Sequence, residues 1–138
     1  MGGALNCRLS KGNRAMNNLN SILVEGTIKH APFVCHDNGG HFACRFIISS
    51  QRVYRDANNM LVECPNFFII ESDGELAKVA KNKVVGERVR VVGRLRQDRE
   101  ICDCGKPFSE IVIVAEHIEY RPAALPRQIK KSSTRKRK

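Results

Sequence analysis

Five extended runs and one helical run succeed each other along this 138-residue chain, and their order constrains the fold more than any other feature. The extended runs are rich in β-branched and aromatic residues, and several alternate apolar with polar positions as strands do. They cover residues 21–30, 42–54, 61–70, 88–98 and 110–120. The helical run, 73–83, begins at Ser72-x-x-Glu75, which has the spacing of a capping box. The predicted order is therefore three strands, a helix and two strands.

This order predicts an all-β chain with the OB-fold, a five-stranded Greek-key barrel whose helix lies between strands 3 and 4. Other small β-barrels have a similar number of strands, so the order favours the OB-fold without excluding them. The connecting segments carry turn signals: Pro32 ends the first strand, Asp37-Asn38-Gly39-Gly40 follows, and residues 99–109 form a loop. Pro65 inside the third run predicts an edge or bulge position, because proline cannot donate to a strand ladder.

The fourth extended run has the clearest alternation of residue types. One face would carry the small or apolar residues Val89, Val91, Gly93 and Leu95. The opposite face would carry Arg88, Arg90, Arg94 and Arg96. Such a row of cations predicts either contacts to phosphate groups or a solvated surface.

The net charge of +10 is carried by the two ends of the chain. Residues 16–120 hold 13 basic and 14 acidic residues, whereas residues 1–15 and 121–138 hold three and eight basic residues and no acidic one. We therefore predict a flexible leader over 1–15, an OB-fold domain over 16–120 and a disordered basic tail over 121–138. Electrostatic contacts of the tail would come mainly from Lys130, Lys131, Arg135, Lys136, Arg137 and Lys138.

The sequence excludes several classes of protein. No apolar run approaches the ~18 residues of a membrane-spanning helix, and the first residues lack the apolar stretch of a secretory signal. The expected location is therefore the cytoplasm. A nucleophilic cysteine with a histidine is not supported, because no paired acid and base and no phosphate-binding glycine loop accompanies it, so we expect no enzyme.

The chain has six cysteines, many for a cytoplasmic domain of this size. Without an export signal most of them are expected to be reduced thiols, with Cys44 and Cys64 acting as small buried hydrophobes in strands. A composite zinc site would have to combine residues of two loops, Cys35, His36, His41, Cys102 and Cys104. These loops flank the same face of an OB-fold, but Cys-x-Cys is not the usual zinc hook, so we predict no metal and no cofactor.

Several segments resemble, in the same order, the bacterial single-stranded-DNA-binding protein (SSB) family. Residues 20–26 (NSILVEG) resemble its first strand, and residues 44–54 (CRFIISSQRVY) its second strand and the aromatic residue that ends it. Residues 75–77 (ELA) and 86–89 (GERV) resemble its helix and the entry to its fourth strand. Residues 91–96 (VVGRLR) resemble its glycine-x-leucine-arginine strand, which is the most specific of these pieces.

The resemblance covers about residues 18–120 and implies sequence-tolerant binding of single-stranded DNA in replication, recombination or repair. It also implies a homodimer or homotetramer and association with the nucleoid. Single strands bind by stacking bases on aromatic side chains while cations track the phosphates. The stacking aromatics implied by position are Tyr54 and Phe67, and the cations able to contact phosphate are Arg52, Arg55, Arg94 and Arg96.

This chain also departs from the family pattern. Glu100 and Asp73 stand where many relatives carry a stacking aromatic, and Glu75 replaces a frequent lysine. The chain ends in four basic residues, 135–138, where relatives carry an acidic, aromatic-tipped terminus. The resemblance is therefore to a divergent or accessory member. The alternatives are a primosomal-restart-type or RNA-binding OB protein, or an OB-fold interaction subunit that has lost nucleic-acid stacking.

Overall fold

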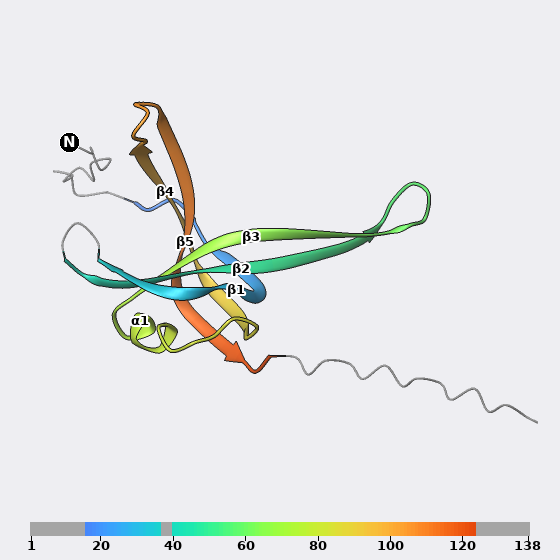
Figure 1. Cartoon of the computed structure of the whole chain (residues 1–138), viewed down its shortest axis with the longest axis horizontal. Helices are drawn as coiled ribbons and strands as arrows, with labels where there is room; N and C mark the ends of the chain where they lie inside the picture. The colour runs from blue at the N-terminus through green and yellow to red at the C-terminus, as the bar shows by residue number, and fades with distance from the viewer. Residues whose placement is uncertain (1–15, 37–39, 124–138) are drawn as a thin grey trace, which may run out of the picture.

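A computed structural model describes residues 16–36 and 40–123 of the chain. Its elements, in chain order, are β1 (Ile22–His36), β2 (Phe42–Arg55), β3 (Leu61–Asp73), α1 (Gly74–Ala80), β4 (Arg88–Ile101) and β5 (Pro107–Arg121). The strands close a barrel in the order β1-β2-β3-β5-β4, with β3 parallel to β5 and every other pair antiparallel (Figure 1). The predicted five-stranded barrel with one helix between strands 3 and 4 is confirmed.

Alternation along each strand fills the barrel interior. Phe46 and Ile48 of β2 and Val91 of β4 are fully buried because every second side chain points inward. The short helix α1 adds Ala77 and Ala80 to the same apolar cluster and so closes one end of the barrel. In Figure 1, α1 lies on the side of the barrel away from the β4–β5 turn.

The first strand is longer than predicted, because Pro32 does not end it. β1 continues to His36, and its pairing with β2 shifts register between Ile28 and His30 and again between His30 and Phe33. Proline lacks a backbone N–H, so a strand can contain it only where the ladder is interrupted. The irregularity around Pro32 provides such a place.

The helix is shorter than predicted and has no capping box. Ser72 is buried at the end of β3, and its hydroxyl donates to the Cys44 carbonyl of β2 at 3.3 Å. Asp73 is the N-cap residue, but its side chain makes no capping bond. Glu75 pairs with Lys78 within the helix instead. The predicted capping box is therefore wrong, because the helix begins one residue later than predicted and the serine hydroxyl bonds to β2.

Two hairpins extend beyond the barrel and point in different directions (Figure 1). We call them the β2–β3 arm, from the Ser49–Phe67 pair outward, and the β4–β5 arm, from the Gln97–Ile111 pair outward. The second arm replaces most of the predicted loop over 99–109. Pro65 lies in the first arm, where β3 pairs only with β2, so the predicted edge position is confirmed. Within the described ranges, no helix is long and apolar enough to cross a membrane.

Candidate nucleic-acid interface

Each arm is a two-stranded ribbon with two faces. The pairing of β2 with β3 runs without a register shift from Ala43–Asp73 to Arg55–Leu61, so side chains alternate strictly between the faces. We call the face that continues the barrel interior the inner face, and the opposite one the outer face. Because Ile48 points into the core, Arg52 and Tyr54 lie on the inner face of the β2–β3 arm.

Tyr54 and Arg52 form the most direct nucleic-acid-binding pair that the structure brings together. The Arg52 guanidinium carbon lies 5.3 Å from the centroid of the Tyr54 ring, within cation–π range. The Tyr54 side chain is 43% exposed, and Arg52 makes no other polar contact within the described ranges. An exposed ring beside an exposed cation can stack a base and contact its phosphate.

The second predicted aromatic, Phe67, lies on the other face of the same arm. It pairs with Ser49 of β2, an outer-face position, and is 57% exposed. Its neighbour Phe68 pairs with the buried Ile48, so Phe68 is the inner-face aromatic and is 37% exposed. Sequence reasoning missed Phe68, although alternation from the apolar Ile70 could have identified it.

Two other predicted arginines, Arg55 and Arg94, do not lie beside an aromatic ring of the described residues as Arg52 does. Arg55 donates from Nη1 to the Asn59 carbonyl at 3.0 Å, so it supports the turn at the end of the β2–β3 arm. Arg94 is exposed on the outer face of β4 and makes no ion pair within the described ranges.

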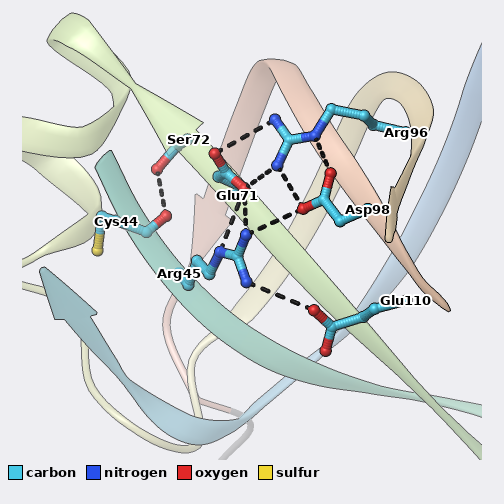
Figure 2. A network of polar contacts seen from close by, with 7 residues as sticks. All are labelled: Cys44, Arg45, Glu71, Ser72, Arg96, Asp98 and Glu110. Carbon is cyan, nitrogen blue, oxygen red and sulfur yellow. Dashed lines mark hydrogen bonds and ion pairs between the residues drawn. The ribbon is translucent and has the colours of Figure 1, made fainter. Parts of the chain in front are cut away.

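The fourth predicted arginine, Arg96, is the centre of an ion-pair network on the outer surface of the barrel, where β2, β3, β5 and β4 lie side by side (Figure 2). It donates from Nε to Asp98 Oδ1 at 2.7 Å and from Nη2 to Glu71 Oε2 at 2.5 Å. Arg45 contacts the same two carboxylates at 3.0 and 3.2 Å, and Glu110 at 3.5 Å. We call these five residues the ion-pair network.

The ion-pair network holds three carboxylates and two guanidinium groups, so its charge is negative. Hydrogen bonds from Arg96 hold the pKa of Asp98 below its usual range, and those from Asp98 raise the pKa of Arg96. Arg96 would have to leave Glu71 and Asp98 to reach a phosphate group. The predicted phosphate contact of Arg96 therefore competes with two carboxylates already in place.

Three of the five described cysteines, Cys35, Cys44 and Cys64, are free thiols, and the other two are bonded to each other. Cys102 and Cys104 form a disulfide bond at the end of the β4–β5 arm. Cys44 is buried as predicted, and burial raises the pKa of its thiol. Cys64 is exposed on the β2–β3 arm, so the prediction of a buried residue was wrong there. No cluster of three potential metal-ligating side chains occurs in the part of the chain that the structure describes.

The predicted tail contacts lie outside the described residues, as does the predicted leader over 1–15. These tail residues are Lys130, Lys131, Arg135, Lys136, Arg137 and Lys138. Arg121, predicted to begin the tail, is the last residue of β5.

Comparison with known proteins places this geometry in a family. Residues 19–120 match the model of the single-strand binding protein family. The fold is similar to that of a small single-stranded DNA-binding protein from Streptomyces coelicolor, at 25% identity and a TM-score of 0.60, over 77% of this chain and 96% of that one. It is also similar to a Plasmodium falciparum SSB solved with single-stranded DNA, at 20% identity and a TM-score of 0.67, over 80% of this chain and 100% of that one.

A third similar structure is a deletion mutant of the single-stranded DNA binding protein from Thermus aquaticus, at 24% identity and a TM-score of 0.64. The match covers 75% of this chain and 50% of that one. No curated protein sequence matches the chain. The family consists of DNA-binding proteins rather than enzymes, so the expectation of a non-enzymatic protein that binds single-stranded DNA is confirmed. The matched segment is most of the chain and almost all of the barrel, and the chain belongs to the single-strand binding protein family.

Proposed function

We propose that the protein binds single-stranded DNA without sequence preference by stacking a base on Tyr54 while Arg52 contacts the adjoining phosphate. The observation that carries this proposal is the exposed Arg52–Tyr54 pair on the inner face of the β2–β3 arm. Every base has a π-face, so stacking tolerates sequence and requires an unpaired base. Of the other predicted residues, Arg55 and Arg96 are engaged in internal contacts, and Phe67 and Arg94 face outward.

Fluorescence anisotropy with a labelled 30-nucleotide oligo-dT, an oligo-U of the same length and a duplex tests this function. We expect the full-length protein to prefer oligo-dT over duplex. Tyr54→Leu should weaken oligo-dT binding by about 1–2 kcal/mol, as expected for loss of one stacked base. Val53→Leu, at an exposed position on the outer face of the same arm, is the matched control. Equal affinity for duplex and single strand would contradict the proposal, and tighter binding of oligo-U would favour the RNA-binding alternative.

The basic tail is proposed to add sequence-independent affinity. Seven of the residues 124–138 are basic and none is acidic. Each phosphate neutralised on a single strand steepens the dependence of log K on log salt by about 0.7. Deleting residues 124–138 should therefore flatten this dependence by several units and leave the preference for single strands in place. An unchanged salt dependence would show that the tail makes no phosphate contact.

We also propose that copies of the chain associate through the outer surface of β1, β4 and β5. Leu23 is 68% exposed there, beside a groove of about 710 Å³ whose charged lining includes Glu25, Arg90 and Glu119. Arg90 lies between the two glutamates and pairs with both. The apolar segment 111–114 supports association less than expected, because Val112 and Val114 are already buried within one chain. Light scattering at micromolar concentration should give a dimer or tetramer mass, and a monomer mass would contradict the proposal.

The cellular role follows from these proposals. A protein that covers single strands without reading their sequence would act in replication, recombination or repair, in the cytoplasm and at the nucleoid. The negative charge of the ion-pair network favours one alternative, an interaction subunit that no longer binds nucleic acid. Failure of the full-length protein to bind oligo-dT at low salt would support that alternative.

A further inference from the structure

We propose that Cys102 and Cys104 form a reversible redox site at the end of the β4–β5 arm, whose disulfide bond exchanges with low-molecular-weight thiols while the barrel stays folded. The site is independent of the proposed function, because it concerns the chemistry of two sulfur atoms in a turn and not the binding of DNA. Three features support it: the turn keeps its shape without the bond, the bond joins no two elements, and one of its sulfur atoms is open to solvent.

The backbone of this turn is held by its own hydrogen bonds. The Cys102 N–H donates to the Lys106 carbonyl at 3.0 Å, and the Gly105 N–H donates to the Cys102 carbonyl at 2.8 Å. Residues 56–60, at the end of the β2–β3 arm, make the same two backbone bonds at 3.0 and 2.9 Å in a turn that contains no disulfide bond. Reduction of the Cys102–Cys104 bond can therefore leave the backbone of the turn in place.

The disulfide bond also crosslinks nothing beyond the turn itself. Only Asp103 separates the two cysteines, and both lie beyond the last pair of the β4–β5 ladder, Ile101–Pro107. In the chain-entropy account, a disulfide stabilises a fold by closing a loop in the unfolded chain, and the effect grows with the length of that loop. A loop with a single residue between its cysteines gains little. By linkage, the folded barrel in turn does little to keep the bond closed.

The two sulfur atoms differ in access to solvent. Cys104 is exposed, whereas Cys102 is only partly exposed. The arm that carries them projects away from the barrel (Figure 1). Thiol–disulfide exchange requires that an attacking thiolate reach one sulfur atom of the bond. We therefore assign Cys104 as the sulfur that an external thiolate attacks, and Cys102 as the thiol that leaves and later re-forms the bond.

The exchange passes through a mixed disulfide at Cys104. An external thiolate bonds to Cys104 Sγ, the bond to Cys102 Sγ breaks, and Cys102 leaves as a thiolate that takes up a proton from water. A second external thiolate attacks the external sulfur of the mixed disulfide and releases Cys104 as a thiolate, which is protonated in the same way. Two external thiols thus supply two electrons and leave as one disulfide, while the protein disulfide becomes two thiols. The reverse sequence oxidises the site.

One other described cysteine is exposed, and it provides a control. Cys64 lies on the β2–β3 arm and is a free thiol. A single thiol can form a mixed disulfide with an external disulfide, but it has no neighbour in its own turn to resolve that bond. The Cys102–Cys104 pair can resolve it, because the second sulfur atom lies two positions away in the chain. The two arms therefore predict different end products with the same reagent.

Equilibration with glutathione tests the proposal on the full-length protein. Samples at varied ratios of reduced to oxidised glutathione are quenched with acid, and alkylation followed by peptide mass spectrometry measures the fraction of chains that contain the Cys102–Cys104 bond. We expect the two forms to interconvert as the ratio changes, and circular dichroism to show the same folded barrel in both. The equilibrium constant for forming the bond with glutathione should be less than about tenfold larger in the folded protein than in urea, because folding favours the bond only weakly.

Single substitutions test the roles of the two sulfur atoms. Cys102→Ser leaves the exposed Cys104, so it should form a mixed disulfide with oxidised glutathione at least about threefold faster than Cys104→Ser does. The mixed disulfide should persist in both variants, whereas in the wild type it should resolve into the Cys102–Cys104 bond. Cys64→Ser, on the other arm, should leave the equilibrium of that bond unchanged. Equal rates in the first two variants, or a faster Cys104→Ser, would overturn the assignment of Cys104 as the attacked sulfur.

Three results would overturn the redox site itself. A bond that survives in the folded protein at glutathione ratios that reduce it in urea would be a structural disulfide. Loss of the folded circular dichroism signal on reduction would lead to the same conclusion. Absence of the bond at every ratio would show that the two cysteines act as separate thiols. Binding of single-stranded DNA is tested separately by the oligo-dT titrations, so failure of the redox site leaves the proposed function standing.

Discussion

The two arms end in the same backbone turn. In residues 56–60 and 102–106, the first N–H donates to the fifth carbonyl, at 3.0 Å in both turns. The fourth N–H donates to the first carbonyl, at 2.9 and 2.8 Å, and the fourth residue has a positive φ: 60° at Asn59 and 82° at Gly105. Asparagine and glycine are the residues that adopt this conformation at least cost.

The side chains that close the two turns differ. In the first turn, Asp56 Oδ1 accepts from the backbone N–H groups of Asn58 and Met60, at 2.9 Å each. In the second turn, Cys102 in the equivalent position forms a disulfide bond with Cys104. One backbone shape is thus closed by hydrogen bonds in one arm and by a covalent bond in the other. The comparison shows that the same backbone turn can be stabilised by different side-chain interactions.

The arms also differ where they leave the barrel. The β4–β5 arm is anchored at its base by the ion-pair network, which joins β4 and β5 to β2 and β3. The β2–β3 arm extends as a ribbon held by the pairing of its two strands, and such a ribbon is marginally stable in water. We therefore expect substitutions at the base of the β4–β5 arm to affect the whole fold, and substitutions in the β2–β3 arm to act locally.

The largest effect is expected at Gly93, near the base of the β4–β5 arm. A side chain there would overlap the Val114 carbonyl of β5, because the two backbones approach too closely for a Cβ. Gly93→Ala should lower the free energy of unfolding by about 3 kcal/mol, since rigid backbone must move. Urea unfolding measures this loss, with Ser50→Ala at the base of the other arm as the control. A decrease in the free energy of unfolding of less than about 1 kcal/mol would show that β4 and β5 can move apart at little energetic cost.

The next effect concerns the ion-pair network. Glu71→Gln removes the carboxylate shared by Arg45 and Arg96, whose side chains are only partly exposed. We expect a loss of about 2 kcal/mol in urea unfolding at pH 7, less than for a fully buried pair because solvent screens the remaining charges. Glu63→Gln on the β2–β3 arm should change stability by less than about 0.5 kcal/mol. Similar losses in both variants would remove the distinction between an anchored and a free arm.

The two turn closures should contribute by smaller and similar amounts. Asp56→Ala removes two hydrogen bonds to exposed N–H groups and should cost about 1 kcal/mol. Reducing the Cys102–Cys104 bond should also cost about 1 kcal/mol, below the typical value for disulfides, because the closed loop is so short. Thiol titration should show two additional thiols per chain after reduction. A much larger loss on reduction would mean that the β4–β5 arm depends on its disulfide bond.

The architecture could be predicted from the sequence because the alternation of apolar and polar residues recurs along each strand. The alternation in 88–98 places Val89 and Val91 in the core and the arginines outside, as observed. Local signals failed where tertiary contacts used a residue for another purpose. Ser72 bonds to β2 rather than capping the helix, and Pro32 lies within an irregular strand rather than ending it.

The candidate site was less predictable, because its geometry depends on which residues meet across strands. Tyr54 and Phe67 look equivalent as sequence aromatics, but the register of β2 with β3 places them on opposite faces. Arg96 looks like a free cation within an arginine row, but Glu71 lies 25 positions away and binds it. A position on one face of a strand can be inferred from alternation, whereas an ion-pair partner on another strand cannot.

The smallest expected effect is a pH dependence that distinguishes the bases of the two arms. Hydrogen bonds from Arg96 lower the pKa of Asp98 in the folded protein, so its stabilising effect is complete above the unfolded pKa of about 3.9 and is lost as pH falls through the lower folded value. The difference in unfolding free energy between wild type and Asp98→Asn should therefore be constant from pH 7 to about pH 5 and shrink below pH 4. Its size should stay below about 1 kcal/mol, because the carboxylate is partly exposed. In Glu63→Gln, on the arm without the network, urea unfolding at the same pH values should remain close to the wild type throughout. A difference for Asp98→Asn that grows as pH falls would mean that the ion-pair network destabilises the base of the β4–β5 arm.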